Sequence, residues 1–272
     1  MMAIKGLRFN LDKKVVILTG GLGLIGKDLI TTLTDEGAIL VVLDLPQKQQ
    51  AISILRSSFP ADTATRITYF SVDITDKNAL TTVKDILLSK YKSIDVLINN
   101  AALNPKVEEA NKLIQKPFSF ETMRLDQWNK ELEVNLTGTM LCCQVFGSEM
   151  KSGGSIINIA SIYGVVAPDQ SIYPKDFVKP PAYGVSKAGV INLTKYLAEY
   201  WGNKNVRVNA VVFGGIENHQ NINFIKKYSA KTPLRRMAQL SDYEGVIVFL
   251  ASAASAYATG AIFTIDGGWT AI

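Results

Sequence analysis

Hydrophobic positions along the chain fall into short, nearly continuous apolar runs that are separated by longer amphipathic stretches. Continuous apolar runs are typical of strands in a parallel sheet, because helices cover both faces of such a sheet. The pattern predicts seven strands, at residues 15–18, 39–43, 67–72, 96–98, 155–159, 206–212 and 261–265.

The amphipathic stretches between these runs predict helices. The clearest are residues 24–36, 77–90, 125–150, 183–202 and 242–251. Strand and helix alternate over the whole length, and no repeat or linker divides the chain. We therefore expect a single α/β domain over residues 1–272, a doubly wound Rossmann-type fold with a seven-stranded, mostly parallel sheet and helices on both faces.

One uncharged stretch, residues 245–265, is a candidate for a membrane-spanning helix. Its middle holds Ser252, Ser255 and Thr259, where a spanning helix should be most apolar. We interpret it as a helix end, a turn and a buried strand. Residues 1–14 contain no apolar stretch typical of a signal peptide. These observations predict a cytoplasmic protein without a membrane partner.

Composition excludes several classes of function. The net charge is +5, and the 29 basic residues are scattered rather than clustered, which argues against a nucleic-acid partner. The two cysteines, Cys142 and Cys143, are adjacent and form no metal-ligand spacing. His219 is the only histidine, so a multi-histidine metal site is excluded and we expect no metal.

A glycine-rich turn follows the first predicted strand and opens the first predicted helix. It contains Gly20, Gly23 and Gly26, with Leu24 and Ile25 beginning the helix. Glycines let the backbone approach a pyrophosphate, and the helix N-terminus supplies N–H groups and positive potential. The alternative is a glycine-rich turn without a ligand.

Asp44 ends the second predicted strand, where a carboxylate would accept hydrogen bonds from the adenosine ribose. The same carboxylate would repel a 2′-phosphate. The predicted cofactor is therefore NAD, and NADP is less favoured.

A candidate hydride-transfer site lies in the second half of the chain. Tyr183 and Lys187 stand four residues apart and share one face of a predicted helix. A free phenol, with a pKa of about 10, is a poor base, but a nearby ammonium and a cationic nicotinamide favour the phenolate. Ser161, after a strand, can hold the substrate oxygen. Tyr200 and Lys204 repeat the spacing near a helix end, where packing is the expected role.

The joint pattern resembles the short-chain dehydrogenases/reductases over nearly the whole chain. The matching positions are residues 19–26, Asp73, Asn99-Asn100-Ala101, Asn135, Ser161, Tyr183, Lys187, residues 213–216 and Asp266-Gly267-Gly268.

The resemblance implies roles for several of these residues. Asp73 and Ile74 would lie beside the adenine, and Asn99 and Ala101 near the adenosine ribose. Asn135 would hold a water in a proton relay to Lys187, which also contacts the cofactor, as does Tyr183. Gly214 and Ile216 would face the nicotinamide. The candidates for substrate contact are Tyr163, Gly215 and His219. The resemblance also implies a homotetramer or homodimer.

The chain departs from the shorter branch of this family at the glycine turn. Leu24 replaces the middle glycine, which yields the TGxxGxxG form of the longer, sugar-nucleotide-modifying branch. The interval from Ser161 to Tyr183 is also long, and Phe213 replaces a usual proline. Because the chain lacks that branch's C-terminal substrate domain, an epimerase or dehydratase without net cofactor turnover remains an alternative only.

Two polar segments, residues 103–124 and 168–181, follow strands at the end of the sheet where ligands bind. Their polarity predicts a sugar-like, polyhydroxylated substrate, unless both segments are merely solvated. The leading hypothesis is an NAD-dependent oxidoreductase that acts on an alcohol or carbonyl. A nucleotide-sensing protein without catalysis is the other alternative.

Overall fold

The computed structural model describes residues 9–45, 49–57, 59–104, 119–175 and 177–272. Within these residues one parallel sheet forms the centre of the molecule, with strand order β3-β2-β1-β4-β5-β6-β7. The strands are β1 (Val15–Thr19), β2 (Ile39–Asp44), β3 (Ile67–Ser71), β4 (Val96–Asn99), β5 (Gly154–Ser161), β6 (Val206–Phe213) and β7 (Ile262–Ile265). All seven predicted strands are confirmed.

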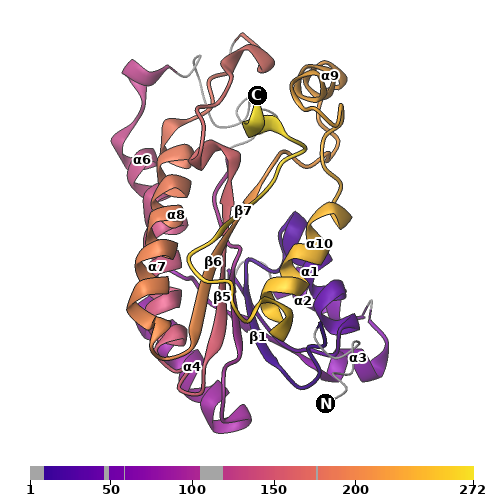
Figure 1. Ribbon diagram of the computed structural model, residues 1–272, viewed down its shortest axis with the longest axis vertical. Helices are drawn as coiled ribbons and strands as arrows, with labels where there is room; N and C mark the ends of the chain where they lie inside the picture. The colour runs from indigo at the N-terminus through magenta and orange to yellow at the C-terminus, as the bar shows by residue number, and fades with distance from the viewer. Residues whose placement is uncertain (1–8, 46–48, 58, 105–118, 176) are drawn as a thin grey trace.

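Helices cover both faces of the sheet, as predicted (Figure 1). One face carries α4 (Lys77–Tyr91), α6 (Leu125–Leu132), α7 (Thr139–Cys142) and α8 (Pro181–Gly202). The other carries α1 (Leu24–Asp35) and α10 (Ser241–Ala251), with α2 (Gln49–Ser57) and α3 (Ala61–Thr65) beside them. A buried apolar cluster fills each side of the sheet, which explains why the strands are apolar on both faces.

The predicted helix over residues 125–150 is interrupted by π-helical turns at Glu133–Gly138 and Cys143–Gly147. Such turns are frequent at functional sites, and the first of them contains Asn135. The predicted sequence of helix end, turn and strand over residues 245–265 is confirmed by α10 and β7. Among the described residues, no helix is long and apolar enough to cross a membrane.

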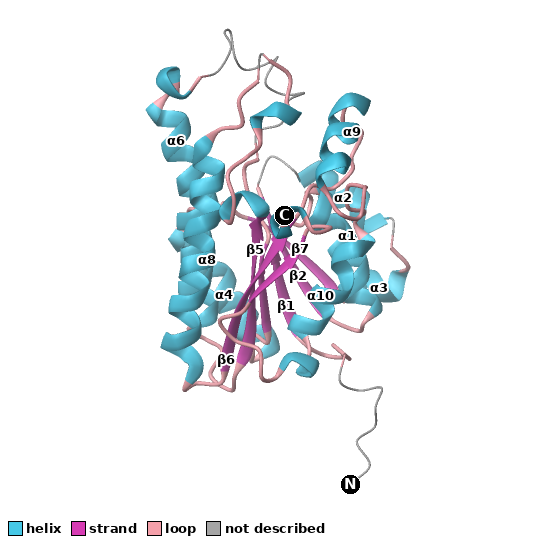
Figure 2. Cartoon of the chain, turned by 45° about the horizontal axis from the view of Figure 1, so that its top comes forward, coloured by secondary structure: helices cyan, strands magenta, loops and turns pink. Residues whose placement is uncertain are grey.

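Three helices do not stand out in the hydrophobic pattern. These are α2, α3 and α9 (Ile222–Lys231), which lies beyond the carboxyl ends of the strands (Figure 2). The five residues of α3 include none that is buried, and α9 buries only Tyr228.

A third apolar cluster lies at the carboxyl end of the sheet. Its buried members are Ala160, Ile162, Ile172, Tyr173, Phe177, Val212, Tyr228, Met237 and Trp269. In this cluster the segment before α8 packs against α9 and the C-terminal turn. The cluster therefore covers the carboxyl ends of the strands.

Candidate active site

The glycine turn between β1 and α1 is held in a conformation that side chains would disrupt. Gly20 has a φ of +66°, and a Cβ there would lie 2.7 Å from Ala101 Cα. A Cβ on Gly26 would lie 2.3 Å from the Gly20 carbonyl oxygen. Gly23 caps α1 without a side-chain hydrogen bond, so the first amides of the helix have no side-chain cap. The turn thus fits a pyrophosphate as predicted.

Asp44 ends β2 beside this turn. Its carboxylate accepts hydrogen bonds from the backbone N–H of Leu22 at 2.7 Å and of Leu45 at 2.8 Å. These bonds fix a buried carboxylate next to the turn, at the place expected for ribose recognition.

Asn100 supports the glycine turn, a role that sequence reasoning missed. Its side-chain amide donates to the carbonyl oxygens of Thr19 and Gly20 at 3.1 and 3.0 Å. The Thr19 hydroxyl accepts from the N–H groups of Asn100 and Ala101. The signal available in the sequence was an amide side chain directly after β4, the strand that neighbours β1.

The side chain of Asn99 points into the core rather than toward a ribose. Its amide donates to Asn158 Oδ1 at 2.8 Å, and Asn158 donates in turn to Thr194 Oγ1 at 2.9 Å. The predicted position of Asn99 near the adenosine ribose stays a prediction.

Asp73 and Ile74 lie between β3 and α4, but neither caps that helix. Asp73 accepts from the backbone and hydroxyl of Thr75, and Asp76 is the N-cap. Ile74 packs so closely on Gly138 that a Cβ there would lie 2.7 Å from its Cδ1.

Tyr183 and Lys187 lie in the first turns of α8, which begins at Pro181, two residues earlier than predicted. Proline is favoured in the first turn of a helix because its missing N–H would be unsatisfied there. Ser161, the last residue of β5, lies beside the Tyr183 phenol, where its side chain lowers the pKa of that phenol. The Lys187 ammonium donates to the Ile159 carbonyl oxygen at 2.7 Å. The structure thus brings together all three predicted catalytic side chains.

Two glycines allow the segment after β5 to approach α8. A Cβ on Gly164 would lie 2.7 Å from the Lys187 carbonyl carbon, and one on Gly184 would lie 2.8 Å from the Tyr163 carbonyl oxygen. This contact sets the distance between Ser161 and Tyr183.

Burial perturbs both titratable groups. It lowers the pKa of Lys187 from 10.5 to about 8. It raises the pKa of Tyr183, and the hydrogen bond from Ser161 opposes that rise. Perturbed pKa values of this kind often mark functional sites.

Asn135, in the first π-helical turn, links the segment after β4 to α8. Its Oδ1 accepts from Leu103 N at 2.7 Å, and its amide donates to the Leu103 carbonyl and to Ser186 Oγ. Ser186 donates in turn to the Tyr183 carbonyl oxygen at 2.7 Å. Asn135 is fully buried and contacts α8 at Ser186, next to Lys187, and its part in a proton relay stays a prediction.

The second Tyr/Lys pair lies outside this site. Tyr200 is 55% exposed and stacks on Tyr196, with ring centroids 6.0 Å apart. Tyr200 also contacts Trp201 and Lys204, whose Nζ lies 6.0 Å from the centroid of the Tyr200 ring.

The segment expected to face the nicotinamide follows β6. Gly215 donates its N–H to the Tyr228 hydroxyl at 2.5 Å, and Ile216 pairs with Ala238. The Gly214 carbonyl oxygen accepts from the Tyr243 hydroxyl at 3.0 Å. His219 is exposed and has a φ of +60°, and its contact with a substrate stays a prediction.

The segment 168–181 is less polar toward the site than its sequence suggested. Tyr173 and Phe177 are buried and belong to the third apolar cluster. Tyr173 shares a hydrogen bond of 2.8 Å with the hydroxyl of Tyr163, and burial raises the pKa of both phenols. Asp169 pairs with Lys231 away from the cluster. The segment therefore presents both polar groups and buried aromatic side chains, because Tyr173 and Phe177 point inward.

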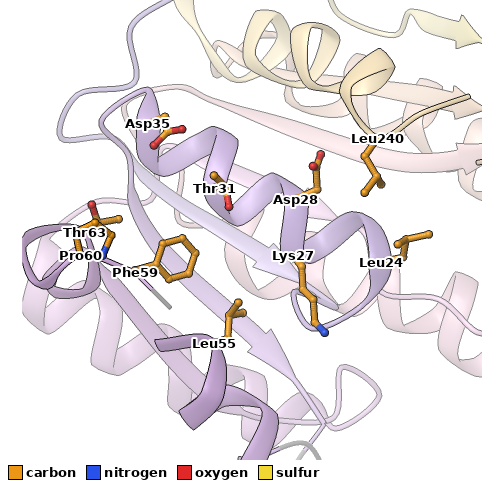
Figure 3. A pocket seen from close by; sticks show the side chains of 10 residues that line it. All are labelled: Leu24, Lys27, Asp28, Thr31, Asp35, Leu55, Phe59, Pro60, Thr63 and Leu240. Atoms are coloured by element: carbon orange, nitrogen blue, oxygen red, sulfur yellow. The ribbon is translucent and has the colours of Figure 1, made fainter. Parts of the chain in front are cut away.

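Most of the other polar segment, residues 105–118, lies outside the described residues. A separate hollow of about 690 Å³ lies along the outer face of α1 (Figure 3). Lys27, Asp28 and Thr31 line it from α1, and Phe59 faces them. It contains none of the catalytic side chains. The described residues contain no cluster of side chains suited to a metal ion.

Comparisons with known proteins agree with this geometry. Residues 24–270 match the family described as enoyl-(acyl carrier protein) reductase. The chain is 32% identical to a 7alpha-hydroxysteroid dehydrogenase of Bacteroides fragilis, with 95% of each chain covered. It is 30% identical to a D-threitol dehydrogenase of Mycolicibacterium smegmatis, covering 96% of this chain and 95% of the relative.

Among solved structures, it is similar to a short-chain dehydrogenase of Leptospira borgpetersenii with bound NAD⁺. The TM-score is 0.82 at 33% identity, with 99% of this chain and 98% of the other covered.

Proposed function

Because this chain belongs to the short-chain dehydrogenases/reductases, which are NAD(P)-dependent oxidoreductases acting on hydroxyl groups, we propose that Tyr183 is its catalytic acid–base. The observation that carries the proposal is the buried contact of the Tyr183 phenol with Ser161, one helical turn from Lys187.

When bound, the nicotinamide cofactor accepts or supplies the hydride. In the oxidative direction the Tyr183 phenolate takes the hydroxyl proton of the alcohol, and Ser161 donates a hydrogen bond that orients the same oxygen. In reduction the phenol returns the proton. Burial alone raises the pKa of Tyr183, so the positive charge of Lys187 has to oppose this effect. Asn135 braces α8 at Ser186 and thereby orients both groups.

The substitution Tyr183→Phe tests the assignment. It removes only the hydroxyl, so the fold and cofactor affinity should be retained while turnover falls about 10²–10⁴-fold, the usual contribution of a general acid–base. Tyr200→Phe, the control with the same sequence spacing, should keep normal turnover. Near-normal turnover of Tyr183→Phe, measured by absorbance of the reduced nicotinamide, would contradict the proposal.

We further propose NAD rather than NADP as the preferred cofactor. The buried Asp44 carboxylate, fixed by Leu22 N–H, would repel a 2′-phosphate. Asp44→Ser should weaken NAD binding about tenfold and reduce the difference between the affinities for NAD and NADP. Fluorescence titration of the wild type with both reduced cofactors checks this, and tighter NADPH binding would overturn it.

For the substrate we propose a small polyhydroxylated alcohol or the corresponding carbonyl compound. The named relatives act on both a polyol and a steroid, so likeness alone does not choose between them. The hydroxyls of Tyr163 and Tyr173 beside the site supply hydrogen-bonding groups within an aromatic surface. Activity confined to steroid or long-chain acyl carbonyls in a substrate screen would rule this out.

A further inference from the structure

The segment that follows β6 begins beside the candidate catalytic serine. Phe213, the last residue of β6, pairs with Ser161, the last residue of β5, in the register of the parallel sheet. The residues from Gly214 to Ile216 therefore leave the sheet at the same edge as Ser161. Hydride transfer requires the nicotinamide to lie against the carbon whose oxygen is held by Ser161 and Tyr183. This segment therefore lies where a nicotinamide has to be bound.

Two tyrosine hydroxyls contact one peptide group of this segment. Tyr243, on α10, donates its hydroxyl to the Gly214 carbonyl oxygen at 3.0 Å. The N–H of Gly215 donates to the hydroxyl of Tyr228, on α9, at 2.5 Å. This carbonyl and this N–H belong to the same trans peptide group, so they point in opposite directions. Two different helices therefore fix the orientation of a single peptide plane.

The peptide groups on either side are held by backbone hydrogen bonds instead. The Gly214 N–H donates to the carbonyl oxygen of Ile265 on β7 at 3.0 Å, and the Gly215 carbonyl oxygen accepts from the N–H of Ala238 at 2.9 Å. Within the described residues, the peptide group between the two glycines is held by the tyrosine hydroxyls alone. It is therefore the peptide group that the loss of a hydroxyl would free.

The local sequence makes these contacts necessary. Glycine allows a wide range of backbone conformations, so a peptide group between two glycines rotates with little steric resistance. Side chains could not restrict it, because a Cβ on Gly215 would lie 2.8 Å from the Tyr228 ring and one on Gly214 would lie 2.9 Å from Asp266 Cα. Phe213, which replaces a usual proline, does not fix its own φ as proline would. The conformation of the segment therefore depends on its contacts.

Both tyrosines are themselves held firmly in place. Tyr243 is buried and stacks on Phe213, with ring centroids 3.9 Å apart. Tyr228 is buried and stacks on Trp269, with ring centroids 4.4 Å apart. Burial raises the pKa of both phenols, so the two hydroxyls stay neutral near pH 7. Removing either hydroxyl therefore changes no charge and deletes only one hydrogen bond.

We propose that Tyr228 and Tyr243 are positioning residues for the nicotinamide, because their hydroxyls fix the Gly214–Gly215 peptide group and thereby the orientation of Ile216 toward the ring. The proposal rests on the proposed function. Both tyrosines act through the backbone and need no contact with the cofactor. Since the glycine turn after β1 binds the other half of the cofactor, loss of a tyrosine hydroxyl should weaken the binding of the nicotinamide half only.

Two ligands distinguish the halves of the cofactor. NADH contains the nicotinamide, and ADP-ribose is the same molecule without it. In Tyr228→Phe and in Tyr243→Phe, the Kd of NADH measured by calorimetry should rise about three- to tenfold, which corresponds to the loss of one hydrogen bond. The Kd of ADP-ribose should be unchanged in both variants. A purely structural role would not separate the two ligands in this way.

Tyr91→Phe is the matched control. It removes a tyrosine hydroxyl that lies 3.2 Å from Thr68 Oγ1 on β3, at the opposite edge of the sheet from β7. Both dissociation constants should equal those of the wild type. Turnover gives a second readout: on any alcohol that the wild type oxidises, kcat of Tyr228→Phe should fall about tenfold, because a less well oriented nicotinamide is less well aligned for hydride transfer.

Each failure has its own signature. Equal losses of affinity for NADH and ADP-ribose, or an unchanged Kd of NADH in the folded variants, would overturn the positioning role and leave the oxidoreductase proposal intact. If one variant does not fold, the other decides. If neither folds, the wild type decides, since equal affinities for NADH and ADP-ribose would overturn the proposal and tighter binding of NADH would support it. A wild type that binds neither NADH nor NADPH would instead overturn the function on which this inference rests.

Discussion

At the scale of single residues, the candidate site contains a buried charge that is unfavourable for folding. Lys187 is 3% exposed, and its hydrogen-bond acceptor is a backbone carbonyl, that of Ile159, rather than a carboxylate. A buried ammonium of this kind destabilises the fold while it serves the chemistry, a trade-off known at active sites.

The pH dependence of stability follows from the pKa of Lys187. Folding lowers this pKa from 10.5 to about 8, so between these values the unfolded chain binds more protons and the free energy of unfolding rises with pH. Below pH 8 the full cost of burying the charge applies, up to about 3 kcal/mol.

Lys187→Met should therefore raise the free energy of unfolding at pH 7 by about 1–3 kcal/mol while it abolishes turnover. The gain should shrink toward pH 10, as the wild-type lysine loses its charge in the fold. Urea denaturation at both pH values measures this. Lys195→Met, an exposed lysine of the same helix, should leave stability nearly unchanged. A destabilised Lys187→Met at pH 7 would show that the bond to Ile159 outweighs the cost of burial.

At the scale of elements, the distance between β5 and α8 controls the geometry of catalysis. Ser161 ends the strand and Tyr183 begins the helix, and the turn at Gly164 fits between them only because it has no side chain. Long-range contacts of this kind position catalytic groups more rigidly than the sequence spacing does.

Gly164→Ala should shift this turn away from α8, since its Cβ would lie 2.7 Å from the backbone of Lys187. A displacement of about 1 Å at a catalytic group can cost about 10²-fold in rate, so we expect kcat to fall 10- to 100-fold. Cofactor affinity, measured by titration, should change little.

The control is Gly245→Ala in α10, where an added Cβ meets nothing within 4 Å. It should preserve kcat and stabilise the helix by up to about 1 kcal/mol. Equal kinetics for the two variants would mean that the turn after β5 does not set the distance between Ser161 and Tyr183.

At the scale of the whole molecule, the described residues leave an apolar surface exposed on α6 and α8. Leu125, Val185, Tyr196 and Tyr200 are all exposed, and the two tyrosines stack at an interplanar angle of 11°. Exposed apolar groups on neighbouring helices are typical of a subunit interface. The predicted homotetramer or homodimer would bury them.

We expect the double substitution Tyr196→Glu with Tyr200→Glu to dissociate the assembly, because two carboxylates would have to be buried at the interface. Light scattering coupled to size-exclusion chromatography measures the molar mass. Ile54→Glu, at an exposed apolar position on α2, should leave the mass unchanged. A wild type that elutes as a monomer would contradict the prediction of an oligomer.

The sequence by itself determined the strands and the order of the main helices, and it supplied the candidate residues of the chemistry. Local signals carry these: apolar runs for β1 to β7, glycines before α1, and Tyr183 and Lys187 four apart on one helix. Only the tertiary structure decided which way side chains of similar character point. Asn99 turns into the core, Asn100 supports the glycine turn, and the segment 168–181 directs its aromatic rings inward.

The meeting of Lys179, Asn104 and Tyr183 was likewise decided by the tertiary structure. Lys179 and Tyr183 stand four residues apart around the start of α8, but Asn104 follows β4, so no spacing along the chain encodes the contact of Asn104 with Lys179. Periodicity reports what one element buries, whereas a buried charge between two loops depends on how several elements pack together.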